Sequence, residues 1–390
     1  MTNPAAMLLR LASVALLVLS FALSAEVLSF VYLRYVTGVA WAPDFLRANS
    51  APGPVWLTEF EPWGAWHAAN SEGRQQSSCF SVALRSNYFG ARDRERTING
   101  NIHRTIVLGD SFAEGWGVEA EEQLSNILEA RLGREFLNFA TENDFGPLQY
   151  QLIYEQLASR FAHDHVLILF LPDNDFTDND ADYWRQFRPD FFERYRPYYR
   201  MDGHAYVPLY PVPKPPDGFI DHRSAPQSGL ITAAKRMARE NSSMLALYRY
   251  LRLRFQRAGA YSGYLDYTPE QQEAVLWSLR RIKAAAGERR VTLVIIPRRH
   301  DFAQVATRGN PLGKLLRRFG HENDITVIDL LDAMPQLEPQ IERYFLPCDG
   351  HWSAVGNRIA AEALLTRISF DGPNRPSGGI ERSRAGADGR

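Results

Sequence analysis

Short apolar runs alternate with longer helical patterns along most of the chain. Each run is rich in aliphatic and β-branched residues, which is typical of a strand buried inside a sheet. The runs lie at 105–108, 136–139, 166–171, 291–296 and 325–328. Apolar residues at helical spacing predict helices near 119–132, 148–160 and 269–286. Strands that alternate with helices favour an α/β fold with a doubly wound parallel sheet covered on both faces.

The N-terminal segment is apolar over a length that can cross a bilayer. Between Leu11 and Leu33 the only charged residue is Glu26, and a membrane span needs about 20 apolar residues. A cleaved signal peptide ending at Ala22-Leu23-Ser24 is the alternative. Apolar residues resume after Glu26, which favours an uncleaved anchor over 1–34, with Glu26 near the outer interface or facing a partner. With either an uncleaved anchor or a cleaved signal peptide, the rest of the chain is expected to lie outside the cytoplasm. The uncleaved anchor would also make this a single-pass membrane protein.

The remaining chain divides into a linker, one large domain and a tail. Glycine and proline are frequent in the linker at 35–56, and the domain at 57–370 holds all the predicted strands. Within it, 180–267 departs from the strand–helix pattern and contains aromatic, proline-rich and basic stretches. We expect this insertion to form a lid-like region over the carboxyl edge of the sheet, where α/β folds bind ligands. The tail at 371–390 lacks apolar periodicity and is expected to be disordered.

Charge and cysteine content narrow the range of partners. The chain has 44 Lys and Arg against 45 Asp and Glu, for a net charge of −1, which argues against nucleic acid as a partner. Cys79 and Cys348 are its two cysteines. In an oxidising compartment they permit one disulfide, but two unrelated buried thiols fit the sequence equally well.

Three polar motifs adjoin predicted strand ends. Ser111 follows the strand at 105–108, within the sequence Gly-Asp-Ser-Phe, where a hydroxyl is exposed next to backbone N–H groups. Asp349 and His351 precede the last amphipathic helix, and this pair suits a base whose tautomer is fixed by a carboxylate. Asn174 follows the strand at 166–171 and has an amide that can donate to an oxyanion. Taken singly, each residue is an ordinary turn or helix-start residue.

Together these motifs resemble the blocks of the SGNH/GDSL hydrolase superfamily. The serine motif matches the first block, Asn174-Asp175 the third and Asp349-Gly350-His351 the last, while Asn87, Gly90 and Arg92 resemble a lead-in found in membrane-anchored members. The resemblance implies a flavodoxin-like sheet and a Ser111–His351–Asp349 triad. It also implies an oxyanion hole formed by the Ser111 N–H, an N–H from the second block and the Asn174 amide.

The chain departs from the family pattern at three places. Pro172 replaces the usual glycine of the third block, and the D-x-H spacing followed by Trp352 is similar to alginate-type polysaccharide O-acetyltransferases. The second block carries no glycine at the family position, which falls near Asn143. Asparagine tolerates positive φ, yet we favour Gly146, slightly later in the chain, as the oxyanion donor.

The resemblance predicts a serine esterase or O-acyltransferase that acts on an envelope or extracellular ester, such as an acylated glycan. A catalytically silent domain that binds glycan or scaffolds the envelope is the alternative. We expect no metal or other cofactor. His163 and His165 lack further ligands at a recognised spacing, and the acidic run at 173–180 lacks the glycine and glutamate of a calcium loop.

Overall fold

A computed structural model describes most of the chain. The described residues are 4–37, 43, 56–77, 79–142, 144–187, 189–192, 194–203, 205–214, 234–235, 237–238, 241–255, 261–335 and 340–368. Most of the predicted linker at 35–56 and the predicted disordered tail at 371–390 lie outside these ranges.

Five parallel strands form the central sheet, in the order β11-β10-β7-β5-β6. In chain order they are β5 (Arg104–Leu108), β6 (Glu135–Asn138), β7 (His165–Phe170), β10 (Arg290–Ile295) and β11 (Thr326–Asp329). Counted from β6 by place in the chain, the order is 2-1-3-4-5, which is the flavodoxin-like arrangement. The predicted doubly wound parallel sheet is therefore confirmed, and each strand lies within two residues of its predicted range.

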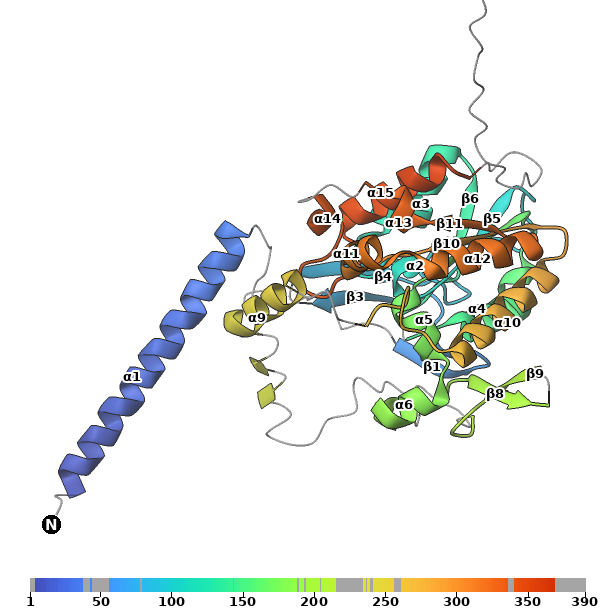
Figure 1. Ribbon diagram of the computed structural model, residues 1–390. Helices are drawn as coiled ribbons and strands as arrows, with labels where there is room; N and C mark the ends of the chain where they lie inside the picture. Colours follow the sequence, from blue (N-terminus) through green and yellow to red (C-terminus); the bar gives the residue numbers. More distant parts are fainter. Residues whose placement is uncertain are drawn as a thin grey trace, which may run out of the picture.

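Helices cover both faces of this sheet (Figure 1). The helices α3 and α15 pack on each other on one face, and α4 and α10 pack on each other on the opposite face. The helices of the sheet domain are α2 (Ser111–Glu114), α3 (Leu124–Leu132), α4 (Pro147–Gln156), α5 (Pro172–Asp178), α10 (Pro269–Ala286), α11 (Arg299–Arg308), α12 (Pro311–Glu322), α13 (Leu330–Ala333), α14 (Gln340–Arg343) and α15 (Ala354–Leu365). Apolar residues at helical spacing, such as Val275, Leu279 and Ile282 on α10, are buried and seal the sheet from water.

In the part of the chain that the structure describes, three antiparallel hairpins lie outside the central sheet. Their strands are β1 (Trp56–Glu61) with β2 (Gly64–His67), β3 (Glu72–Ser77) with β4 (Phe80–Arg85), and β8 (Tyr198–Asp202) with β9 (Ala205–Leu209). The first two hairpins precede β5, the strand that leads to Ser111. Their sequence has no pattern that predicts a strand.

The described residues of the insertion include α6 (Ala181–Phe187), α7 (Pro189–Phe192), the β8–β9 hairpin and α9 (Ser243–Arg254). Tyr199 and Tyr206 of the hairpin pack edge-on against Trp277 of α10, and the Tyr199 hydroxyl lies 2.7 Å from the Ser278 hydroxyl. The hairpin therefore covers α10, while the expectation that the insertion forms a lid over the carboxyl edge of the sheet stays a prediction. The interaction that places the hairpin is aromatic packing on α10.

The N-terminal helix α1 (Pro4–Val31) projects away from the body and continues as a π-helical turn at Tyr32–Val36 (Figure 1). By length and composition it can cross a membrane. Its C-terminal part contacts α9, which lies between α1 and the body.

Candidate active site

Ser111 lies at the carboxyl end of β5, at the point where the chain turns into α2. The turn is tight, because a Cβ on Gly109 would lie 2.5 Å from the Ala113 Cβ and 3.0 Å from the Leu169 carbonyl oxygen. Asp110 caps α2 by accepting a hydrogen bond from the Phe112 N–H at 2.9 Å. As the first residue of α2, Ser111 has a backbone N–H with no intrahelical partner. The neighbouring strand β7 ends beside it, so Ser111 lies at the topological switch point of the sheet.

The three residues of the predicted triad lie together at this edge. The Ser111 Oγ is 2.8 Å from the His351 Nε2, and the His351 Nδ1 is 3.3 Å from the Asp349 Oδ1. The His351 and Asp349 side chains are 20% and 22% exposed, so solvent reaches both of them. The imidazole therefore lies between a hydroxyl and a carboxylate, the geometry in which it can take up the serine proton.

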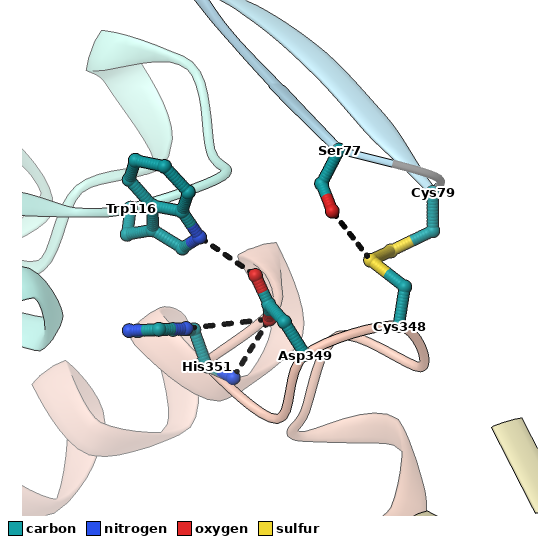
Figure 2. Close-up of a disulfide and its surroundings, with 6 residues drawn as sticks. All are labelled: Ser77, Cys79, Trp116, Cys348, Asp349 and His351. Carbon is teal, nitrogen blue, oxygen red and sulfur yellow. Dashed lines mark hydrogen bonds and ion pairs between the residues drawn. A yellow bond between two sulfur atoms is a disulfide. The ribbon is translucent and has the colours of Figure 1, made fainter. Parts of the chain in front are cut away.

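Asp349 is held in its orientation by several donors (Figure 2). Its Oδ2 accepts a hydrogen bond from the Trp116 indole N–H at 2.6 Å, and its Oδ1 accepts one from the His351 backbone N–H at 3.1 Å. Burial alone would raise the pKa of Asp349, but the charge and hydrogen bonds of His351 and the Trp116 N–H outweigh burial and lower it. The carboxyl is therefore ionised, as its role beside an imidazole requires.

Aromatic rings fix the position of the His351 ring. Its centroid lies 4.8 Å from that of Phe112 and 5.9 Å from that of Trp116. The adjacent Trp352 is buried and packs edge-on against Phe112, with centroids 5.3 Å apart. The tryptophan after the histidine thus supports the serine turn through Phe112.

A disulfide joins Cys79 and Cys348, with Cα atoms 5.7 Å apart. It connects the turn of the β3–β4 hairpin to the residue before Asp349, and the Ser77 hydroxyl donates to the Cys348 sulfur at 3.6 Å (Figure 2). Of the two possibilities that the sequence left open, the disulfide is confirmed. It ties the loop that carries the histidine to the hairpin.

Asn174 lies on α5, beside Asp110. Its Nδ2 donates to the Asp178 Oδ2 at 2.8 Å and lies 3.4 Å from the Asp110 Oδ2. The amide is thus near the serine turn but is engaged by carboxylates. Its oxyanion role stays a prediction.

The predicted oxyanion donor from the second block is less well supported by the structure than the contact between Ser111 and His351. The Gly146 N–H donates to the Gln149 side chain at 3.1 Å inside the N-terminal turn of α4, so the geometry gives this favoured residue a capping role. Asn143, the position indicated by family spacing, lies outside the described residues. Its neighbour Asp144 has a positive φ of 55°, the conformation for which a glycine is ordinarily selected.

Sequence reasoning missed a buried polar layer behind the serine turn. Arg92 donates to the carbonyl oxygens of Gly115 and Val118 at 2.6 and 2.8 Å, which gives the arginine of the lead-in motif a physical role. Glu114 pairs with His67 at 3.2 Å and accepts from the Glu142 N–H at 2.6 Å. Burial opposes ionisation of Glu114, but the hydrogen bond and charge of His67 and the charge of Arg92 outweigh burial and lower its pKa.

The two neighbouring histidines, His163 and His165, are hydrogen-bonded to side chains of the protein. The His163 ring bonds to the Tyr154 hydroxyl at 2.9 Å, and burial, with the nearby Arg289 charge, lowers its pKa to about 4. His165 lies in the core, 2.9 Å from the Thr292 hydroxyl. Within the described ranges, no cluster of three or more potential metal ligands occurs.

No protein-family model matches the chain, and no curated protein matches it. Among solved structures, a member of the lipolytic protein G-D-S-L family from Veillonella parvula DSM 2008 is 13% identical, with a TM-score of 0.35, over 68% of this chain and 99% of that chain. The lipase/acylhydrolase from Enterococcus faecalis is 15% identical, with a TM-score of 0.36, over 71% of this chain and 100% of that chain. Similarities this remote do not assign this chain a family or an activity.

The chain's own geometry defines its class of fold. The sheet order is 2-1-3-4-5, Ser111 follows its first strand, and Asp349 and His351 precede its last helix. This is a flavodoxin-like fold with the three residues in the arrangement that the resemblance to SGNH/GDSL hydrolases implied.

Proposed function

We propose that this protein is a membrane-anchored serine esterase or O-acyltransferase of the SGNH/GDSL type, with Ser111 as nucleophile and His351 as its base. The observation that carries the proposal is the contact of 2.8 Å between the Ser111 Oγ and the His351 Nε2, together with the Asp349 carboxylate on the other ring nitrogen. A nucleophile, a base and an orienting group in hydrogen-bond reach are the requirements for covalent acyl transfer.

In the proposed reaction, the Ser111 oxygen attacks the ester carbonyl while His351 takes its proton. His351 then returns that proton to the leaving alcohol, and an acyl-enzyme remains. Water, or a sugar hydroxyl, attacks the acyl-enzyme with the same histidine as base, which restores the serine. Asp349 stays ionised throughout and stabilises the imidazolium.

The developing oxyanion needs donors beside Ser111. The Ser111 backbone N–H supplies one, because it begins α2 and has no intrahelical partner. We assign a second to Asn174, which lies next to Asp110, and expect its amide to leave Asp178 when substrate binds. Replacing Asn174 with alanine is then expected to lower turnover roughly 100- to 1,000-fold.

The substrate we propose is an acylated glycan or another ester of the cell envelope. Support comes from α1, which can anchor the body to a membrane, and from the disulfide, which belongs to an oxidising compartment outside the cytoplasm. The D-x-H-W sequence at Asp349–Trp352, similar to polysaccharide O-acetyltransferases, favours a sugar as the alcohol component.

The test is active-site labelling of the full-length protein in detergent micelles. A fluorophosphonate probe is expected to modify Ser111, identified by peptide mapping. Ser111→Ala and His351→Ala are each expected to lower turnover of p-nitrophenyl acetate by at least about 10⁴-fold while leaving thermal unfolding unchanged.

Ser159→Ala is the matched control, because the Ser159 hydroxyl donates a hydrogen bond to the nearby Glu155 carbonyl at the end of α4. It should keep both labelling and turnover. If Ser111 stayed unlabelled in folded protein, the scaffold alternative would replace the enzyme proposal. Transfer of a labelled acetyl group to an oligosaccharide, rather than to water, would identify an acyltransferase.

A further inference from the structure

The carboxylate of Glu26 on α1 caps the N-terminus of α9. It accepts hydrogen bonds from the Ser242 hydroxyl at 2.5 Å and from the N–H groups of Ser243 and Met244 at 2.6 and 3.3 Å. First-turn N–H groups lack intrahelical partners, and the N-terminus of a helix favours negative charge. The one charged residue of the apolar segment is therefore the residue that attaches α9 to the anchor.

One face of α9 packs onto the protein. Ala246 is buried against Leu33 of the anchor, and Phe30, Leu247, Tyr250 and Cys79 pack around this pair. The same small cluster thus contains residues of α1, α9 and the disulfide. Because α9 is held at its N-terminus and along this face, its orientation relative to α1 is fixed.

The opposite face of α9 exposes a stripe of large apolar side chains. Met244, Tyr248 and Phe255 are 43%, 61% and 69% exposed, and their spacing of four and seven residues places them on one side of a helix. Leu251, half-buried, lies on the same side. Basic residues flank this stripe at Arg249 and Arg252, and the sequence of α9 has no acidic residue. Apolar residues bordered by arginines are typical of a helix that lies in a membrane interface.

The position of Glu26 along α1 sets the depth of this helix. Since a helix rises about 1.5 Å per residue, the segment from Met7, where the candidate span begins, to Glu26 covers roughly 30 Å, the thickness of the hydrocarbon core. Arg10 lies one turn inside the near end of this segment, from where its long side chain reaches the headgroups. Glu26 then lies at the boundary of the core, and Phe30 and Leu33 lie at headgroup level. As α9 packs on those two residues, it lies at that level too.

We propose that α9 is an interfacial helix that rests on the same bilayer that α1 crosses. Its apolar stripe enters the boundary between headgroups and acyl chains, and Arg252 contacts lipid phosphates. The lipid surface is the occupant that fits, because the stripe is continuous with the anchor and its charge complements anionic headgroups. The proposal rests on α1 crossing the membrane, which is part of the proposed function.

This arrangement would seat the catalytic body on the membrane. Cys79 packs in the α9 cluster and is bonded to Cys348, next to Asp349. Glu26, α9, the disulfide and the triad loop therefore form one connected series of contacts. The active site is thus held at a set height above the lipid, where esters of the envelope surface can reach it.

The test uses full-length protein in vesicles of mixed phosphatidylcholine and phosphatidylglycerol. Both native cysteines are in the disulfide, so Tyr248→Cys gives a single thiol for a nitroxide spin label. We expect a label at this position to collide with oxygen several-fold more often than with a water-soluble nickel chelate. Tyr88→Cys is the matched control: Tyr88, on the body, is 65% exposed, and the label there should show the reverse ratio.

A label at Val18→Cys in α1 reports insertion of the anchor separately. If that label is in the bilayer and the Tyr248→Cys label behaves like the control, the interfacial helix is wrong while the anchor stands. Low access of both reagents to position 248 would mean that protein covers the stripe, which would also overturn the proposal. Ester turnover is measured on the same samples, so a failure of the catalytic assignment would be seen independently.

Discussion

Asp110, the residue before Ser111, has a buried carboxyl group whose charged form is disfavoured by burial. Burial raises its pKa to about 6, although the Phe112 N–H, the His351 charge and the Asn174 amide favour the ionised form. An unfolded aspartate has a pKa near 3.8. Between these values the folded protein binds more protons than the unfolded chain, so the free energy of unfolding falls as pH rises.

Replacing Asp110 with asparagine is expected to remove this pH dependence. Asparagine keeps an oxygen that can cap the Phe112 N–H but does not ionise. The variant's free energy of unfolding, relative to that of the wild type, should therefore increase between pH 4 and pH 7, by on the order of 3 kcal/mol from the pKa difference. Urea unfolding of both proteins at several pH values measures it. A difference that stays constant with pH would show that the Asp110 pKa is not raised.

At the scale of single residues, the sequence allowed a prediction where a short motif contains the residues that suggest the chemistry. Ser111, Asp349 and His351 could be expected to lie together because adjacent residues define each block, and the structure brings them into contact. The roles of Trp116 and Arg92 could not be predicted, because they depend on partners brought near by folding. The Trp116 indole bonds to an aspartate 233 residues away, and no local pattern signals such a contact.

Among the elements, the β3–β4 hairpin has a role that depends on the disulfide. It is connected through Cys79 to Cys348 and so to the triad loop. Replacing Cys79 or Cys348 with serine is expected to lower stability by up to about 5 kcal/mol in the chain-entropy model. Turnover should fall as well, because a shift of about one ångström in the His351 ring can cost about a hundredfold in rate.

Cys79→Ser, Cys348→Ser and the variant with both changes should show similar decreases in the midpoint temperature of thermal unfolding and in kcat, because each removes the same bond. Ser77→Ala is the control: it removes a neighbour of the Cys348 sulfur but leaves the bridge. Full activity of Cys79→Ser would mean that the disulfide does not position the base.

Element prediction succeeded where the local pattern and the tertiary environment agree. The helix predicted at 269–286 matches α10 because Thr268 caps it and Gly287 ends it. The strand β3 was missed because its sequence, Glu-Gly-Arg-Gln-Gln-Ser, has no apolar alternation, and pairing with β4 makes it extended. The single helix expected at 119–132 is divided into a 3-10 turn and α3 at Gln123.

For the whole molecule, the apolar helix α1 leads to a prediction of topology. Arg10 precedes the apolar segment and Arg34 follows it, so positive charge does not fix the orientation. We expect the body to be exported, because the disulfide requires an oxidising compartment. Alkaline phosphatase fused after Trp56 should be active, and the full-length protein should remain in the membrane pellet after carbonate washing.

A body starting at residue 38 behind a cleavable signal peptide is the control and should be released in soluble form. Release of the native protein with a mature N-terminus near Ala25 would contradict the anchor and favour a signal peptide.

The sequence predicted that Glu26 lies at the outer interface or faces a partner. In the structure its carboxylate contacts α9 of the same chain, a contact that the sequence did not indicate because the two segments are 216 and more residues apart.

The distance of 240 residues between Ser111 and His351 in the chain has a consequence for the timing of activity during synthesis. At about 5–20 residues per second, roughly 10–50 seconds pass between the appearance of the nucleophile and that of its base. Throughout that interval the growing chain carries a serine with no base and a cysteine with no bonding partner. On the proposed mechanism, esterase activity begins only on molecules that have been translated almost to the end, and a chain terminated before His351 is expected to be inert.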